Sequence, residues 1–313
     1  MTIVFKVSEN VREKMIAYYK DAKREKTPPY AVFQADEADT IITLYESGKA
    51  MFQGVSADID ANIWVDMEKK LNNRTIDINE PKKEKEKYKE ELNYFYSMPT
   101  IGSDEVGTGD YFGPIVVTAT FVDKTKIDFI NDLGVKDSKK LTDDKILKIA
   151  PLLIKEIPYV TYTLNNKEYN TYQNKGYNMN KIKAILHNKV LYSLTHKEEK
   201  YPYSKIVVDQ FVYPRKYFEH ILEAKEKVTD ITFTTKAESK CASVAAASVI
   251  SRYIFLMKMD ELTKELGIDI PKGANAIVDQ VGKEIVTKYG FNKLNEIAKL
   301  NFKNTDKIKE ALR

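Results

Sequence analysis

Two adjacent carboxylates, Asp104 and Glu105, are followed by a turn containing three glycines and then by the apolar run Ile115–Val122. Val, Ile, Thr and Phe dominate that run, which predicts a buried strand paired with the strand that carries the two acids. Neighbouring side chains on a strand point to opposite faces, so both acids face one way only where the strand ends or bulges. Gly107 and Gly109 allow such a bend. Burying two carboxylates without an adjacent cation is costly, which favours a divalent-metal site; the alternative is a surface turn with two solvated acids.

Two other ligand-binding motifs do not fit this turn. The spacing from Gly107 through Gly109 to Gly113 departs from G-x-G-x-x-G, and no G-K-[ST] follows, so a phosphate-cradling loop is not indicated. An EF-hand requires acidic residues at alternate positions and a closing Glu, and this turn has neither.

Two further acids stand at the ends of predicted strands. Asp209 ends a short apolar run, and open α/β sheets place their sites at the carboxyl ends of strands. Glu238 follows the predicted strand Ile231–Thr235 and precedes a helix of small residues that can pack closely on a sheet. Simpler explanations exist for both, since Asp209 can cap the next turn and Glu238 can be a first-turn helix acid favoured by the helix dipole.

Taken together, the predicted strand ends carry Asp104, Glu105, Asp209 and Glu238 to one edge of a sheet. Carboxylates gathered at one edge repel strongly unless divalent cations bind between them. Ligands that are all oxygen suit Mg²⁺ or Mn²⁺. Pairs of such ions serve in-line hydrolysis of phosphodiesters, which is the chemistry that this set predicts.

Bulk composition limits the alternatives. The chain has 313 residues, enough for two domains, and a net charge of only +4, so binding to a polyanion must depend on local patches. The single cysteine, Cys241, excludes an internal disulfide, fits a reducing cytosol, and is expected to be a buried thiol. His187, His196 and His220 leave no zinc set and are expected to be ordinary helix residues. No signal peptide is expected at Met1, and no hydrophobic stretch is expected to be long enough to span a bilayer.

Residues 1–75 are predicted to form a small independent α+β unit with the order β-α-β-β-β-α. The expected elements are strands Thr2–Val7, Tyr30–Gln34, Thr40–Glu46 and Ala50–Gln53, and helices Ser8–Arg24 and Asp58–Leu71. Lys20, Lys23, Arg24 and Lys26 cluster at one helix end, either as a solvated face or as phosphate contacts. Residues 76–94 carry charges of both signs and few apolar side chains, which predicts a linker.

Residues 95–313 alternate longer strands with helices, which predicts an α/β domain that includes the C-terminal helices. The expected strands are Thr100–Val106, Ile115–Val122, Val160–Leu164, Ile206–Asp209 and Ile231–Thr235. The expected helices are Asp143–Glu156, Met179–Thr195, Arg215–Lys225, Ala242–Leu266, Ala276–Tyr289 and part of the last twenty residues.

Several long motifs in this second domain match a known family in order and spacing. They are Asp104-Glu105-Val106-Gly107-Thr108-Gly109-Asp110-Tyr111-Phe112-Gly113-Pro114, Lys136-Asp137-Ser138-Lys139-Lys140-Leu141, Asp209, and Lys236-Ala237-Glu238 ahead of Ala245-Ala246-Ala247-Ser248-Val249-Ile250-Ser251-Arg252. The chain here resembles the type 2 ribonucleases H and, more narrowly, bacterial ribonuclease HIII. The N-terminal unit resembles, by topology and position, the TATA-binding-protein-like substrate-binding domain of that subfamily. The resemblance implies an α/β ribonuclease H-like fold, with helices flanking a mixed sheet, behind a small α+β domain.

The resemblance also implies an activity, namely endonucleolytic hydrolysis of the RNA strand of RNA–DNA hybrids by two metal ions, leaving 5′-phosphate and 3′-hydroxyl ends. Asp104, Glu105, Asp209 and Glu238 would be the catalytic and metal-binding set, with Mg²⁺ or Mn²⁺ as cofactor. The glycine–arginine–glycine signature of ribonuclease HII is Gly107-Thr108-Gly109 here, and its fourth catalytic Asp is Glu238. Both departures fit ribonuclease HIII. The missing arginine argues against efficient incision at a single embedded ribonucleotide.

Substrate contacts are expected at two places. The backbone around Gly107, Thr108 and Gly109 is small enough to approach the minor groove and donate to the 2′-hydroxyl groups that distinguish RNA from DNA. Ser138, Lys139 and Lys140 are expected to contact phosphates, unless they form only a solvated loop ahead of a helix. The N-terminal unit would add sequence-independent affinity for the hybrid.

Two other functions remain open at this level, a nucleic-acid-binding protein without chemistry and another nuclease of the ribonuclease H fold. The complete carboxylate set argues against the first, and the long motifs argue against the second. We expect a cytoplasmic monomer that acts on RNA–DNA hybrids with no obligatory protein partner and no membrane association.

Overall fold

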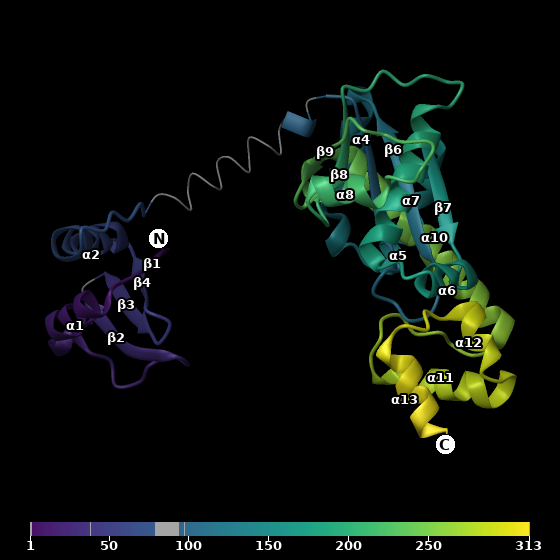
Figure 1. Cartoon of the computed structure of the whole chain (residues 1–313). Coiled ribbons are helices and arrows are strands. Elements are labelled where there is room, and N and C mark those ends of the chain that lie inside the picture. The colour runs from purple at the N-terminus through teal and green to yellow at the C-terminus, as the bar shows by residue number, and fades with distance from the viewer. Residues whose placement is uncertain (1, 38, 79–93, 97, 313) are drawn as a thin grey trace. The chain divides into compact units, whose positions relative to one another are not determined.

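The computed structural model describes residues 2–37, 39–78, 94–96 and 98–312. The chain divides into two compact units, Met1–Lys89 and Glu90–Arg313, each with its own core (Figure 1). The predicted linker at 76–94 falls largely on residues outside the described part.

The N-terminal unit is a four-stranded antiparallel sheet of order β1-β4-β3-β2 with two helices. Its elements are β1 (Thr2–Lys6), α1 (Glu9–Tyr18), η1 (Lys20–Ala22), β2 (Ala31–Glu37), β3 (Thr40–Tyr45), β4 (Lys49–Gly54) and α2 (Ala57–Asn72). Alternation along the strands gives the sheet a face that packs on the helices; in β1, Ile3 and Phe5 are buried whereas Val4 is exposed. Trp64 belongs to the core of this unit, and its indole N–H donates to the Tyr19 hydroxyl at 2.9 Å.

The first helix is shorter than predicted. It ends at Tyr18 instead of Arg24, because the residues that follow add to the sheet. Lys23 forms a bridge with Ala35, and the Arg24 N–H donates to the Gln34 carbonyl at 2.8 Å. Pairing at this edge satisfies the backbone groups of these two residues and competes with continuation of the helix.

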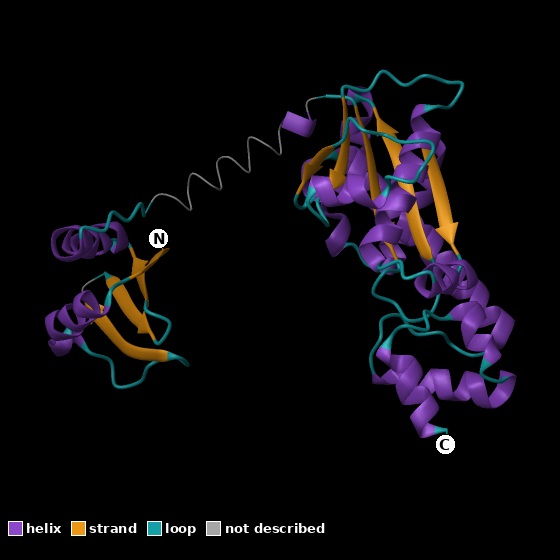
Figure 2. Ribbon diagram, viewed as in Figure 1, coloured by secondary structure: helices purple, strands orange, loops and turns teal. Residues whose placement is uncertain are grey.

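The C-terminal unit contains a five-stranded mixed sheet of order β7-β6-β5-β8-β9. Its strands are β5 (Thr100–Val106), β6 (Ile115–Val122), β7 (Tyr159–Leu164), β8 (Lys205–Asp209) and β9 (Thr232–Thr234). The central strand β5 pairs antiparallel with β6 and parallel with β8. This is the predicted α/β architecture of a mixed sheet flanked by helices (Figure 2).

The C-terminal unit contains helices on both faces of this sheet and others that follow toward the C-terminus (Figure 1). They are α4 (Ile127–Asp132), η3 (Val135–Lys140), α5 (Asp143–Glu156), α6 (Asn166–Asn174), α7 (Met179–Thr195), α8 (Pro214–His220), α9 (Ala237–Lys240), α10 (Ala242–Leu266), α11 (Ala276–Tyr289), α12 (Asn292–Ile297) and α13 (Lys303–Ala311), with the short η2 (Lys124–Lys126). Residues of β6 with odd numbers pack with α7 and those with even numbers with α10, so these two helices lie on opposite faces. The bounds of α5, α7, α10 and α11 match their predictions, whereas α8 ends five residues before the predicted Lys225.

Local signals explain where these helices begin. Thr142 accepts a hydrogen bond from the Lys145 N–H at the start of α5, and Asn178 accepts one from the Lys181 N–H at the start of α7. Close packing of α10 on β5 depends on Gly102, because a Cβ there would lie 2.5 Å from Ser243 Oγ.

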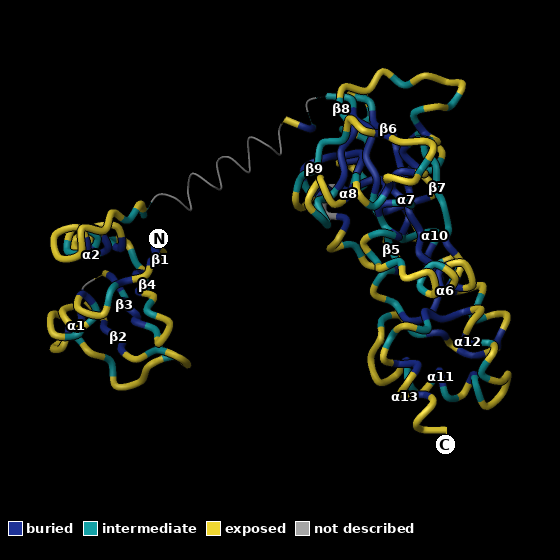
Figure 3. Tube along the Cα trace, viewed as in Figure 1, coloured by how far each residue is buried: buried dark blue, intermediate teal, exposed yellow. Residues whose placement is uncertain are grey.

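Within the described part of the chain, α10 is the one helix long and apolar enough, by length and composition, to cross a membrane. It has 25 residues, and its most apolar window has a mean hydropathy of 1.3. The expectation that no hydrophobic stretch is long enough to span a bilayer was therefore wrong. The same window is 61% buried, and the helix lies against β5 and β6 (Figure 3). These are the properties of a core helix.

Candidate active site

Asp104 and Glu105 lie on opposite faces of β5, which runs on without a bulge to Val106. The pairing of β5 with β8 stops at Ser103, whereas its pairing with β6 continues to Val106. One edge of β5 is therefore open beside both acids, and their side chains reach the same cavity from the two faces. The bend that the glycines were expected to make at the acids is absent; the turn begins only after Val106.

Asp104 faces α10. Its carboxylate accepts the Glu105 N–H at 2.9 Å, and its backbone carbonyl accepts the Ser251 hydroxyl at 3.1 Å. Burial of the carboxyl and the charges of Glu105 and Glu238 raise the pKa of Asp104 to about 8, although a hydrogen bond with Ser248 opposes the rise. This carboxyl group is therefore held in a place where its own charge is strongly disfavoured.

Glu105 faces α7, and two side chains one helical turn apart bind it. The Lys183 ammonium group contacts Oε1, and His187 Nε2 lies 2.9 Å from Oε2. Burial opposes ionisation of Glu105, but the His187 hydrogen bond and the Lys183 charge outweigh burial and lower its pKa. Glu105 is thus ionised and fixed, in contrast to its neighbour.

The other two acids come from the next strand and from a short helix. Asp209 ends β8, and its carboxylate accepts the Ala237 N–H at 3.0 Å. Glu238 lies in α9 with a buried side chain, 2.5 Å from the Lys139 ammonium group. Partial burial disfavours the Lys139 charge, but Glu238, Asp104 and Asp209 outweigh it and raise the pKa of Lys139.

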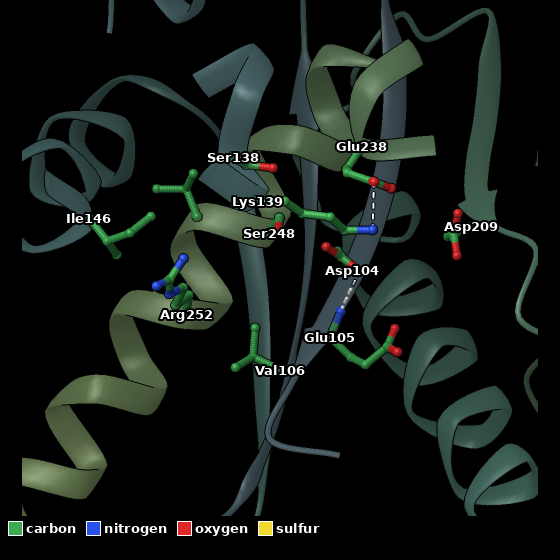
Figure 4. A pocket seen from close by; sticks show the side chains of 11 residues that line it. Asp104, Glu105, Val106, Ser138, Lys139, Ile146, Asp209, Glu238, Ser248 and Arg252 are labelled. Carbon is green, nitrogen blue, oxygen red and sulfur yellow. Dashed lines mark hydrogen bonds and ion pairs between the residues drawn. The ribbon is translucent and has the colours of Figure 1, made fainter. Parts of the chain in front are cut away.

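All four acids line one cavity of about 310 Å³ (Figure 4). Its lining residues are Asp104, Glu105, Val106, Ser138, Lys139, Ile146, Asp209, Glu238, Ser248, Val249 and Arg252. The tertiary structure therefore brings Asp104 and Glu105 together with Asp209 and Glu238, which lie more than a hundred residues further along the sequence.

Oxygen donors of this kind suit a hard divalent cation. Among the described residues, however, no group of three acids, histidines or cysteines is oriented to hold one ion. Glu105 is paired with Lys183 and Glu238 with Lys139, so two of the four acids already have lysine partners. The carboxylate donors are of the type that binds a divalent ion. Such an ion would also compensate the negative charge of Asp104, which is disfavoured in its absence. Closer coordination requires a long side chain such as Glu238 to rotate.

The expected substrate-binding residues are placed unequally. Ser138 and Lys139 line the cavity, and Ser138 Oγ is buried with no hydrogen-bond partner among the described residues. Lys140 is exposed and Gly107–Gly109 follow β5 directly, but neither is part of the cavity wall. Ser138 to Lys140 belong to a 3₁₀-helix, η3, and not to the loop considered as the alternative to phosphate contacts.

Four contributors to the site were missed by sequence reasoning. Lys183 and His187 carry a detectable signal, since their spacing of four puts them on one face of the helix. The expectation that His187 is an ordinary helix residue is incomplete, because its ring contacts Glu105. Ser248 and Ser251 stand in the motif of the small-residue helix, but no spacing in the sequence indicates their contacts with Asp104.

Comparisons with known proteins agree with this fold. A family model described as Ribonuclease HII matches residues 101–305, and a domain of unknown function, DUF3378, matches residues 2–75. The crystal structure of Bst-RNase HIII in complex with Mn²⁺ is similar to this chain with a TM-score of 0.71 at 36% identity, covering 100% of this chain and 99% of that one. Fold and acidic cavity together define the class as a type 2 ribonuclease H.

Relatives narrow the class. The ribonuclease HIII of Bacillus licheniformis is 43% identical over 98% of this chain and 97% of its own length. That of Bacillus velezensis is 44% identical over 99% of this chain and 97% of its own length. The chain belongs to the ribonuclease HIII family, as its motifs predicted, and is a ribonuclease H.

Proposed function

We propose that this ribonuclease H cleaves the RNA strand of RNA–DNA hybrids endonucleolytically and leaves 5′-phosphate and 3′-hydroxyl ends. The observation that carries the proposal is one cavity lined by Asp104, Glu105, Asp209 and Glu238, in which neighbouring charges and burial raise the pKa of Asp104 to about 8. Two divalent ions, Mg²⁺ or Mn²⁺, held by these acids would remove that conflict. The crystal structure of the relative Bst-RNase HIII with Mn²⁺ supports this assignment.

When bound, ions of this type activate a water for attack on phosphorus and stabilise the departing 3′-oxygen. The acids of this chain have different tasks around that chemistry. Asp104 experiences the charge of both Glu105 and Glu238, so its ionisation depends most on a compensating cation. Glu105 is already ionised by its contacts on α7. Glu238 must exchange Lys139 for a new partner before it can act as a ligand.

Phosphate binding is assigned to the η3 segment. Ser138 has a buried hydroxyl with no partner among the described residues, and it faces the cavity as a donor for a phosphate oxygen. The Lys139 side chain is 69% exposed and can leave Glu238 for a phosphate. Lys140 follows it on the exposed side of η3.

Recognition of the RNA strand is assigned to the backbone of Gly107, Thr108 and Gly109. Gly107 has φ of 95°, and a Cβ on it would lie 2.2 Å from the Pro114 carbonyl, so only glycine fits this turn. A Cβ on the exposed Gly109 would meet nothing within 4 Å, which leaves that position open to an approaching groove. Backbone N–H groups there would donate to 2′-hydroxyls.

The test is cleavage of end-labelled substrates by the full chain, with Mg²⁺, with Mn²⁺ and with EDTA. The substrates are an RNA–DNA hybrid, duplex RNA, duplex DNA, and DNA containing one ribonucleotide. We expect metal-dependent internal cleavage of the hybrid alone, with 5′-phosphate products and poor incision at the single ribonucleotide. Binding without cleavage in every metal would instead indicate a hybrid-binding protein, and cleavage of duplex DNA would indicate a different nuclease.

A further inference from the structure

His187 is fully buried in α7, and both of its ring nitrogens have partners. Nδ1 lies 2.7 Å from Ser103 Oγ, and Nε2 lies 2.9 Å from Glu105 Oε2. A carboxylate can only accept, so Nε2 carries a hydrogen; in the neutral ring, Nδ1 then accepts from the Ser103 hydroxyl. The ring also stacks on Phe211, with centroids 5.4 Å apart.

Both partners of this ring lie on the same face of β5, because Ser103 and Glu105 are two residues apart on the strand. The imidazole therefore spans two positions of one strand and cannot rotate without losing a contact. Its orientation is fixed by Ser103 on one side and by the Phe211 ring in the stack.

Lys183 completes the arrangement from one turn earlier on α7. Its ammonium group contacts Glu105 Oε1 and lies 4.0 Å from the centroid of the Phe211 ring, and its side chain is only 13% exposed. Each carboxylate oxygen of Glu105 thus has its own donor on α7.

The other cavity acids are held differently. Asp104 and Asp209 each accept a backbone N–H, and Glu238 binds the exposed ammonium group of Lys139. Glu105 differs from them, because two side chains of α7, Lys183 and His187, set the direction of its carboxylate. None of the four cavity acids lies on α7.

We propose that His187, braced by Ser103, is a positioning residue that fixes the direction of the Glu105 carboxylate for cation binding, with Lys183 as its charge complement. This inference rests on the proposed function, in which Glu105 is a metal ligand. Partners of this kind orient a ligand, and their loss costs roughly 10- to 100-fold in metal affinity or activity. The contacts to the hybrid are assigned above to η3 and to the glycine turn and not to Glu105, so KM for the hybrid is expected to stay unchanged.

Two near-isosteric substitutions separate the two ring contacts. His187→Gln places an amide donor near the position of Nε2 and keeps the bond to Glu105, whereas His187→Asn places a polar group near Nδ1 and keeps only the contact with Ser103. His196→Gln, at the exposed C-terminal end of the same helix, is the matched control. Mn²⁺ affinity is measured by titration calorimetry on the full-length proteins, together with kcat, KM and the unfolding temperature in EDTA.

We expect His187→Asn to lose about tenfold or more in Mn²⁺ affinity and in kcat. His187→Gln should stay within a few-fold of the wild type, and His196→Gln should be unchanged. Equal losses in the Asn and Gln variants, or a change confined to KM, would overturn the positioning role. A lower unfolding temperature in EDTA identifies a variant whose loss of Mn²⁺ affinity or kcat results from lower stability of the fold.

A double substitution tests whether the effect passes through Glu105. Glu105→Gln lowers Mn²⁺ affinity by removing the ligand charge, and adding His187→Asn to it should then cost little more. Additive losses would contradict the inference, because His187 would then act by another route. If the wild type itself takes up no Mn²⁺, the proposed function fails first, and the inference falls with it for a distinguishable reason.

Discussion

Asp104 is the residue at which function and stability oppose each other. Burial and the charges of Glu105 and Glu238 raise its pKa to about 8, so the charged form is disfavoured in the metal-free protein. Groups placed for chemistry often destabilise the fold that holds them, since the same low-dielectric site strengthens repulsion. The measurable consequence is a substitution that stabilises the protein and removes its activity.

Replacing Asp104 by Asn should abolish hybrid cleavage and raise the free energy of unfolding in EDTA by on the order of 1–3 kcal/mol at pH 9. The reason is that Asn keeps the size of the side chain and its hydrogen bonds but carries no charge. Chemical denaturation measures the stability and the labelled hybrid measures the activity.

Mn²⁺ provides the control for this substitution, because a ligand that binds only the folded state stabilises it. It should stabilise the wild type more than the Asn variant. Retained turnover in the Asn variant would refute the role of Asp104, and unchanged stability would contradict the charge conflict.

At the level of elements, a buried lysine from the segment between α12 and α13 contacts the glycine turn after β5. Lys299 is fully buried and donates to the carbonyls of Asp110 and Gly113 at 2.8 and 2.6 Å. Burial lowers its pKa to about 7, although the charge of Asp110 opposes this. The segment between α12 and α13 therefore helps to set the conformation of the turn assigned to the RNA strand.

Lys299 makes stability depend on pH in a predictable direction. Its pKa is about 7 in the folded protein and 10.5 for an ordinary lysine, so between these values the unfolded chain binds more protons. Stability should therefore rise with pH across this window, by at most about 1.4 kcal/mol per unit. The free energy of unfolding of the wild type minus that of Lys299→Met should therefore increase from pH 7 to pH 10. Lys303→Met, at an exposed position, is the control, and a flat or falling difference would contradict the buried charge.

At the scale of the whole molecule, a net charge of +4 on 313 residues gives weak general attraction for a polyanion. We assign the additional affinity to the N-terminal unit, whose sheet has one face packed on helices and another that exposes Val4, Val32 and Lys6. With this assignment, a change in the N-terminal unit would alter affinity without altering the cavity.

Removal of residues 1–89 tests this division. Hybrid affinity should fall at least about tenfold, with a smaller dependence of binding on salt, because phosphate contacts are lost. The Mg²⁺ or Mn²⁺ concentration needed for half-maximal cleavage should stay the same, because no cavity residue is removed. Binding can be measured by fluorescence anisotropy with labelled hybrid. Equal affinity for the truncated and full-length proteins would exclude an anchoring role.

Much of the fold could be predicted from the chain because its signals are local. The bounds of β6 follow from a run rich in β-branched residues, and those of α7 and α10 follow from periodicity and small residues. The end of α1 could not be predicted, because it depends on Lys23 pairing with a strand edge distant in sequence.

By itself the sequence determined the family, the α/β architecture and which four acids are candidates for one site, because motifs and periodicity are properties of neighbouring residues. Only the tertiary structure decided that Asp104 and Glu105 reach one cavity from opposite faces, and that His187 and Lys139 contact acids from other elements. Such contacts depend on which helix covers which face of the sheet. Packing between distant elements sets that choice, and local sequence carries no record of it.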